Sequence, residues 1–179
     1  MKNKKNIKIL ITGAKGQDGI LLSKKLVSKN YRVFGLVKNK KYKNKINKIS
    51  YFPINLKNKT KIKKYILKIK PEIIVHFGSE NPSHDERAKK KNFFYENYIN
   101  SKNLINSSLY LNKKVFFVFT SSSLIFKKKY GVVYEKDEFK IKDSYSKFRI
   151  MILKYLNSIK NKNFSYSNLI LFNHDSKYR

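Results

Sequence analysis

The 179-residue sequence contains no cysteine and no tryptophan, and only six glycines and three prolines. Without cysteine, a disulfide framework and any thiolate metal site are excluded. No apolar run approaches the ~20 residues of a membrane-spanning helix. The short run at residues 7–11 leads into a glycine loop, unlike the apolar region of a signal peptide. We therefore expect one cytoplasmic globular domain over residues 1–179.

Acidic residues are also scarce, since 11 Asp and Glu stand against 42 Lys and Arg, and the formal net charge is +31. Such a charge makes a nucleic-acid binder one alternative. However, nearly all the cations are lysines spread along the whole chain, and arginine occurs only at positions 32, 87, 149 and 179. The abundant residue types share A/T-rich codons, so a genomic base bias accounts for them. We expect the field to attract anionic small molecules, not nucleic acid.

Short apolar runs alternate with amphipathic stretches along the chain. Strands are expected at residues 7–11, 31–37, 51–54, 73–77, 115–119 and 166–172. Helices are expected after residue 19 and at residues 62–69, 91–110 and 144–159. This alternation predicts an α/β fold, a doubly wound parallel Rossmann sheet of about six strands with helices on both faces. Pro53 indicates that the third strand lies near an edge or an end.

The first strand runs into the loop Thr12-Gly13-Ala14-Lys15-Gly16-Gln17-Asp18-Gly19. A strand, a glycine-rich turn and a helix in this order are typical of dinucleotide binding, although glycines alone also make ordinary turns. We expect Gly13 to allow the turn, Gly16 to admit a pyrophosphate, and Gly19 to let the helix pack close to the strand. The N–H groups at the helix start would face the phosphates.

The end of the second strand distinguishes NAD from NADP. An acidic side chain there binds a ribose hydroxyl, whereas a cation pairs with a 2′-phosphate. The sequence has Lys38, Lys40 and Lys41 and no acid nearby, which favours NADP, although lysine is frequent throughout. After the third strand, Asn55-Leu56 is either a contact for the adenine edge or an ordinary turn.

A hydroxyl-rich run, Thr120–Ser123, follows the fifth strand, and Tyr145 begins a helix about two dozen residues later. A tyrosine, with an ordinary pKa of ~10, needs positive charge nearby to act as a base near neutral pH. Arg149 stands at position i+4, on the same helix face, and supplies that charge. Taken alone, the Thr120–Ser123 run is typical of a capping loop, and Tyr145 is typical of a half-buried helix residue. Together with the glycine loop they predict a catalytic site.

At these residues the chain resembles the extended short-chain dehydrogenases, and among them the GDP-mannose 4,6-dehydratases. The resemblance rests on the Gln17-Asp18-Gly19 loop ending, on Asn30–Gly35 as a GYxVxG-like strand, and on Leu171–Arg179, which is similar to an LFNHES-P-R-R segment. It spans nearly the whole chain, which stops before the substrate-binding domain of that family. It implies a homo-oligomeric lyase that uses NADP to convert GDP-mannose to GDP-4-keto-6-deoxymannose.

The resemblance implies a role for each matched position. The catalytic hydroxyl falls on Ser122, the tyrosine base on Tyr145, and its cationic partner on Arg149. The implied cofactor contacts, joined here by Lys38, are Gly13, Ala14, Lys15, Gly16, Gln17, Asp18, Asn55, Leu56, Phe77, Gly78, Ser79, Glu80, Asn81, Tyr145, Arg149, His174 and Arg179.

Two positions depart from the family pattern. The lysine partner of the tyrosine is Arg149, and the dehydratase glutamate is Leu124. Leucine exchanges no proton, so the step that removes the C5 proton and expels the C6 hydroxyl loses its acid–base group. The sequence does not place Glu135 or Glu138 there. Three alternatives remain: a dehydratase, an epimerase or C4 reductase that needs only the hydroxyl and the tyrosine, and a cofactor-binding protein without turnover.

Overall fold

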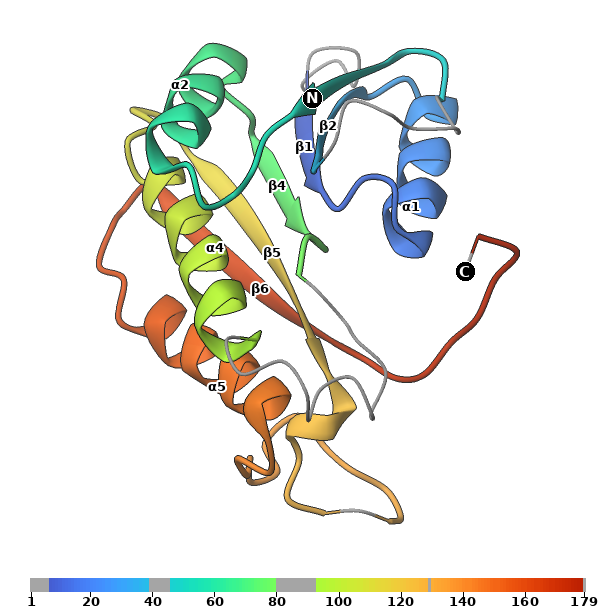
Figure 1. Cartoon of the computed structure of the whole chain (residues 1–179), viewed down its shortest axis with the longest axis vertical. Coiled ribbons are helices and arrows are strands. Elements are labelled where there is room, and N and C mark those ends of the chain that lie inside the picture. The colour runs from blue at the N-terminus through green and yellow to red at the C-terminus, as the bar shows by residue number, and fades with distance from the viewer. Residues whose placement is uncertain (1–6, 39–45, 80–92, 129, 179) are drawn as a thin grey trace.

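The structure of the chain is a computed structural model, which describes residues 7–38, 46–79, 93–128 and 130–178. Strands and helices alternate along it (Figure 1). The elements are β1 (Lys8–Thr12), α1 (Gln17–Ser28), β2 (Arg32–Val37), β3 (Ile49–Pro53), α2 (Lys59–Ile69), β4 (Ile73–His76), α4 (Phe93–Ser108), β5 (Val115–Ser122), the 3₁₀ turn η2 (Ser123–Ile125), α5 (Ser144–Asn157) and β6 (Phe164–Leu171). Most bounds lie close to those expected, but β5 runs on through Ser122.

All six strands form one parallel sheet in the order β3-β2-β1-β4-β5-β6. The expected doubly wound sheet is therefore confirmed, and Pro53 ends the edge strand β3. The direction of winding reverses between β1 and β4, where Thr12 lies opposite His76. Open α/β sheets bind their ligands at the carboxyl ends of the strands at such a switch point.

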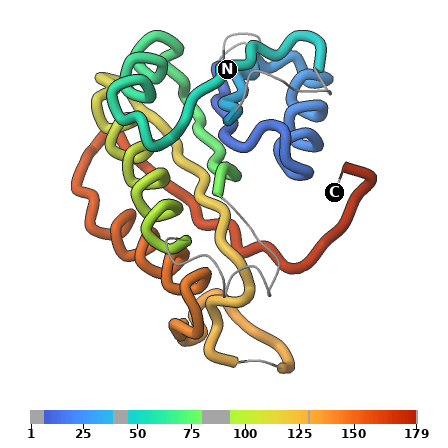
Figure 2. Tube along the Cα trace, in the orientation of Figure 1, coloured from blue at the N-terminus to red at the C-terminus, as the bar shows by residue number. Residues whose placement is uncertain are grey.

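Helices cover both faces of the sheet, but unequally (Figures 1 and 2). Because successive strand residues point to opposite faces, Leu10 and Ile74 join the larger core beneath α2, α4 and α5, whereas Ile9 and Ile11 join a smaller core beneath α1. Within the described ranges, α1 is the one helix on its face, beside β1 and β2. No residue of β6 is fully buried. None of the described helices is long and apolar enough to cross a membrane.

Candidate functional site

The glycine loop makes a tight turn between β1 and α1. Gly13 has a φ of 66°, a left-handed conformation that glycine adopts without strain. Gly16 is the N-cap of α1, and its N–H donates to the carbonyl of Gly13 at 2.9 Å. A Cβ on Gly19 would lie 2.3 Å from that same carbonyl oxygen. Gly19 thus lets the first turn of the helix pack on the loop itself, and not directly on the strand as expected.

The turn after β4 packs directly against the glycine loop. A Cβ on Gly13 would lie 2.9 Å from the backbone of Phe77 and Gly78, and a Cβ on Gly78 would lie 2.7 Å from Oγ1 of Thr12. Both positions require glycine, because Gly13 packs on the backbone of the β4 turn and Gly78 packs on the side chain of Thr12. The free N–H groups at the start of α1 therefore lie beside a second stretch of exposed backbone.

Two cavities meet where these turns touch. The first, of about 510 Å³, lies between the glycine loop, the end of β5, the start of α5 and the C-terminal segment. The second, of about 340 Å³, lies between the glycine loop and the ends of β2 and β3. Both are lined by Gly13, Gly16, Gly78 and Ser79. A dinucleotide, two nucleosides joined by a pyrophosphate, matches two cavities that meet at a helix N-terminus.

Most of the predicted site residues line these cavities. Gln17, Asp18, Phe77, Ser122, Tyr145, Arg149 and His174 line the first cavity. Lys15, Lys38, Asn55 and Leu56 line the second. Ala14 lines neither, because its side chain is buried in the core beneath α1. Lys40, Lys41, Glu80, Asn81 and Arg179 lie outside the described residues.

Asn55 has a second contact that bears on its expected role. Its Oδ1 accepts a hydrogen bond from the N–H of Lys57 at 2.9 Å. Asn55 therefore makes the local turn that the sequence offered as one alternative, while it also lines the second cavity.

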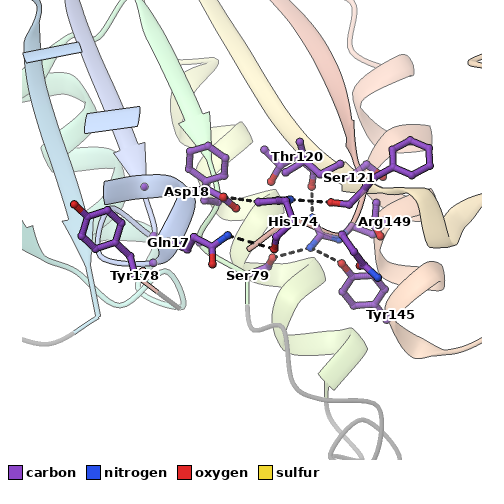
Figure 3. A pocket seen from close by; sticks show the side chains of 18 residues that line it. Gln17, Asp18, Ser79, Thr120, Ser121, Tyr145, Arg149, His174 and Tyr178 are labelled. Carbon is purple, nitrogen blue, oxygen red and sulfur yellow. Dashed lines mark hydrogen bonds and ion pairs between the residues drawn. The ribbon is translucent and has the colours of Figure 1, made fainter. Parts of the chain in front are cut away.

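Tyr145 and Arg149 lie one turn apart at the start of α5, and both are buried (Figure 3). A capping box fixes this start: the Asp143 carboxylate accepts from the Ser146 N–H at 2.7 Å, and the Ser146 hydroxyl accepts from the Asp143 N–H at 3.0 Å. A guanidinium nitrogen of Arg149, Nη2, is 3.2 Å from Oη of Tyr145. The predicted i+4 spacing therefore places a cation beside the phenol.

Arg149 also joins three segments of the site. Its Nη2 lies 3.2 Å from Oγ of Ser79, in the turn after β4, and its Nη1 donates to the carbonyl of Thr120 on β5. The guanidinium thus links the start of α5, the turn after β4 and the end of β5. A lysine, with a single nitrogen, lacks this forked geometry.

Ser122 lies at the end of β5, at the rim of the first cavity. Its hydroxyl accepts from the N–H of Leu124 at 3.3 Å, and the Leu124 side chain is 43% exposed. Glu135 and Glu138 do not line either cavity, and Glu138 pairs with Lys127 at 2.8 Å. Among the described residues that line the cavities, Asp18 carries the one carboxylate.

A comparison with models of protein families identifies the family of this chain. The family model described as "NAD dependent epimerase/dehydratase family" matches residues 9–179. The chain belongs to the NAD-dependent epimerase/dehydratase family. Members of this family are enzymes. The match shows the family, and the expected GDP-mannose 4,6-dehydratase is one more specific activity within it.

Solved structures of similar fold include several UDP-sugar 4-epimerases. The UDP-glucose 4-epimerase of Thermotoga maritima, solved with UDP-glucose, matches with a TM-score of 0.80 at 18% identity, over 92% of this chain and 55% of that one. The Thermus thermophilus enzyme, solved with NAD, gives 0.81 at 16% identity, over 92% and 54%. The UDP-Glc/GlcNAc 4-epimerase of Campylobacter jejuni gives 0.81 at 21%, over 91% and 52%. These likenesses establish the fold, and the chain spans about half the length of each.

In this family member, His174 of the C-terminal segment lies beside Gln17 and Asp18 at the start of α1 (Figure 3). Nε2 of His174 lies 2.7 Å from Oδ1 of Asp18, and the Gln17 amide donates to the His174 carbonyl at 3.4 Å. Farther along, Nζ of Lys24 donates to Oη of Tyr178 at 2.5 Å. The resemblance placed Asp18 and His174 separately at the cofactor, and the structure joins them in one wall of the first cavity.

Sequence reasoning missed Asn100 and Tyr178, which line the cavities, and also His76, which ends β4 and lines neither cavity. The ring of His76 is buried between the hydroxyls of Thr12 and Ser101. Burial, and to a lesser extent the positive charge of Arg149, lowers the pKa of His76 to about 3. The imidazole is therefore neutral at physiological pH. The available signal was a histidine that ends an otherwise apolar strand, next to the cofactor-side turn.

Proposed function

We propose that this chain binds NADP and supports hydride exchange at C4 of a nucleotide sugar. The observation that carries the proposal is the convergence of Ser122, Tyr145 and Arg149 on the cavity beside the glycine loop. A nicotinamide cofactor, when bound, supplies a hydride acceptor that can also return the hydride. The two glycine-lined cavities and the helix N-terminus fit such a cofactor, because they offer free backbone N–H groups where a pyrophosphate would lie.

In this proposal, Tyr145 is the general base. Its oxygen takes the proton of the sugar C4 hydroxyl while C4 loses a hydride, so the C4 alcohol becomes a ketone. The positive charge of Arg149, 3.2 Å away, stabilises negative charge on that oxygen. Ser122, at the cavity rim, binds the same sugar oxygen and orients it.

The preference for NADP rests on the second cavity. Lys15 and Lys38 line it, and no acidic side chain does so among the described residues. Cations beside the ribose pair with a 2′-phosphate, and the net charge of +31 adds a long-range attraction. NAD is the alternative, and it is the cofactor in the Thermus thermophilus epimerase structure.

The cofactor proposal is tested by titrating the full chain with NADP and with NAD. NADP should bind more tightly, and Lys38→Ala should weaken NADP binding while leaving NAD binding unchanged. Lys61→Ala, an exposed lysine on α2, is the matched control for a general loss of positive charge. Gly16→Asp should abolish binding of both, because a carboxylate would occupy the pyrophosphate position. Equal affinities in the wild type would reject the NADP preference.

Two reactions are compatible with this chemistry. Dehydration of GDP-mannose to GDP-4-keto-6-deoxymannose is the first candidate, because the Gln17-Asp18-Gly19 loop ending and the Asn173-His174-Asp175-Ser176 tail resemble that family. Epimerisation or reduction at C4 is the second, because Leu124 stands where the dehydratase has its glutamate. The second reaction needs no acid–base group at C5.

Product analysis separates these candidates. The protein is incubated with GDP-mannose and NADP, and separately with UDP-glucose and NAD, and the sugars are analysed by mass spectrometry and NMR. A product that has lost water identifies a dehydratase, and a product of unchanged mass with an altered C4 signal identifies an epimerase. Tight cofactor binding without any product supports the third alternative, a cofactor-binding protein without turnover.

A further inference from the structure

Three buried polar side chains from three elements lie in a row beneath the cofactor-side turns. Thr12 ends β1, His76 ends β4, and Ser101 lies on α4; they are 1%, 2% and 0% exposed. Oγ1 of Thr12 is 2.6 Å from Nδ1 of His76, and Nε2 of His76 is 2.8 Å from Oγ of Ser101. The parallel register places Thr12 directly opposite His76.

A fourth contact favours one direction for these hydrogen bonds. The backbone N–H of Gly78 donates to Oγ1 of Thr12 at 3.0 Å. Since that oxygen accepts from Gly78, its own proton is available for Nδ1 of His76. With the Thr12 proton on this bond, Nδ1 carries no proton, and Nε2–H donates to Ser101. The sequence of bonds, here called the histidine relay, runs from Gly78 through Thr12 and His76 to Ser101.

The histidine relay ends at the turn that packs against the glycine loop. A Cβ on Gly13 would clash with the backbone of Gly78, and a Cβ on Gly78 would clash with the side chain of Thr12, so the two turns are in close contact. Both glycines line both cavities. Thr120, on β5, also donates to the backbone carbonyl of His76 at 2.8 Å, so three neighbouring strands are linked through His76.

A purely structural role would not require the polar side chains of Thr12, His76 and Ser101. Apolar side chains fill the same core position without the cost of burying polar atoms. A fully paired buried network, in contrast, fixes a unique arrangement of the segments that it joins. Here the joined segments are the two turns that border both cavities.

We infer that His76 is a positioning residue for the dinucleotide, which holds the turns at Gly13 and Gly78 at the separation that the cofactor requires. The inference rests on the proposed cofactor function. His76 lines neither cavity, so it acts on the cofactor through Thr12 and Gly78. The ligand whose binding depends on it is the pyrophosphate and ribose part of NADP or NAD.

Matched hydroxyl variants test the histidine relay. Thr12→Val removes the hydroxyl and keeps the shape, Thr12→Ser keeps the hydroxyl, and Ser101→Ala removes the far end. Ser107→Ala is the control on the same helix, because Ser107 is also buried but donates to the Asn103 carbonyl of its own helix at 2.7 Å. Thr12→Val removes the hydroxyl's bonds to Gly78 and His76 and should weaken NADP binding about tenfold. Thr12→Ser should restore binding, and Ser107→Ala should leave it unchanged.

Affinity and stability are measured on the same samples, by calorimetric titration and by thermal unfolding. If Thr12→Val and Ser101→Ala lower the melting temperature but leave NADP affinity unchanged, the relay is only structural and the inference is wrong. If the wild type binds neither dinucleotide, the proposed function fails and the cofactor role of His76 fails with it. If the wild type binds the dinucleotide and the relay variants bind it with the same affinity, the inference is wrong while the proposed function stands.

A spectroscopic readout tests the direction of the relay independently of ligand binding. Nitrogen-15 NMR of the wild-type imidazole should show a neutral ring with the proton on Nε2. In Thr12→Val, which no longer donates to Nδ1, the Nδ1 resonance should shift, whereas in Ser107→Ala it should not. A proton on Nδ1 in the wild type would contradict the relay.

Discussion

The guanidinium of Arg149 lies 3.2 Å from the phenolic oxygen of Tyr145, one helical turn away on α5. The same group also contacts Ser79 and the carbonyl of Thr120. It therefore places positive charge beside Tyr145 and links three segments of the site. An ammonium group can supply the charge, but it cannot reproduce the fork that contacts β5 and the β4 turn together.

Substitutions at these two positions should separate chemistry from binding. Tyr145→Phe should abolish reduction of NADP by a sugar substrate and leave the dissociation constant of NADP within about twofold, because it removes one hydroxyl and keeps the ring. Arg149→Lys should retain part of the activity, and Arg149→Met should retain none. Reduced cofactor is followed by its absorbance.

The control for the tyrosine variant lies on the same helix. Tyr155→Phe removes a hydroxyl that bonds to Asn106, away from both cavities, and should not affect turnover. If Tyr145→Phe and Tyr155→Phe behave alike, Tyr145 is not the base.

The buried His76 should make the protein less stable in acid. Burial first, and the charge of Arg149 second, lower its pKa from 6.5 to about 3 in the folded chain. Below pH 6.5 the unfolded chain takes up a proton that the folded chain refuses, so the stability is complete above pH 6.5 and falls as the pH drops toward 3. The largest slope from one such group is about 1.4 kcal/mol per pH unit.

Urea unfolding at several pH values between 7.5 and 4, chosen to span roughly this window, measures the effect. The free energy of unfolding of the wild type should fall relative to that of His76→Gln as the pH drops. A pH-independent difference between wild type and His76→Gln would show that folding does not lower the pKa of His76.

The sequence predicted those parts of the fold whose signals are local. The apolar run before Gly13 specifies β1 and its turn, and the i+4 spacing of Tyr145 and Arg149 specifies their shared face. The end of β5 was harder, because Ser121 and Ser122 look like a loop and become strand only by pairing with β6. Strand pairing of this kind overrides local propensity.

Contacts between distant segments could not be predicted in the same way. Asp18 and His174 are 156 residues apart, and nothing in either local sequence specifies their pairing. The histidine relay needs the register of β1 and β4 and the position of α4, which only the folded chain provides. Polar residues at the ends of apolar strands are the one sequence signal that points to such networks.

Adjacent phenylalanines on β5 should differ widely in their importance for stability. Phe117 is fully buried in the larger core, whereas Phe116 points to the opposite face and is 39% exposed. Phe117→Ala should cost about 3–5 kcal/mol of unfolding free energy, and Phe116→Ala about 1 kcal/mol or less. Urea unfolding of both variants provides the comparison. Equal losses would mean that the face of β5 that carries Phe116 is covered.

Leu124 tests which reaction the site performs. It follows Ser122 by two positions and is 43% exposed, so Leu124→Glu should fold with a stability change within about 0.5 kcal/mol. If the missing acid–base group limits dehydration, the glutamate should raise the release of water from GDP-mannose, because it can accept the C5 proton. Leu124→Gln, of equal size and without a titratable proton, should not. If Leu124→Glu and Leu124→Gln are equally inactive while both bind NADP like the wild type, the lost glutamate is not what limits dehydration, and C4 epimerisation or binding without turnover is the better account of this site.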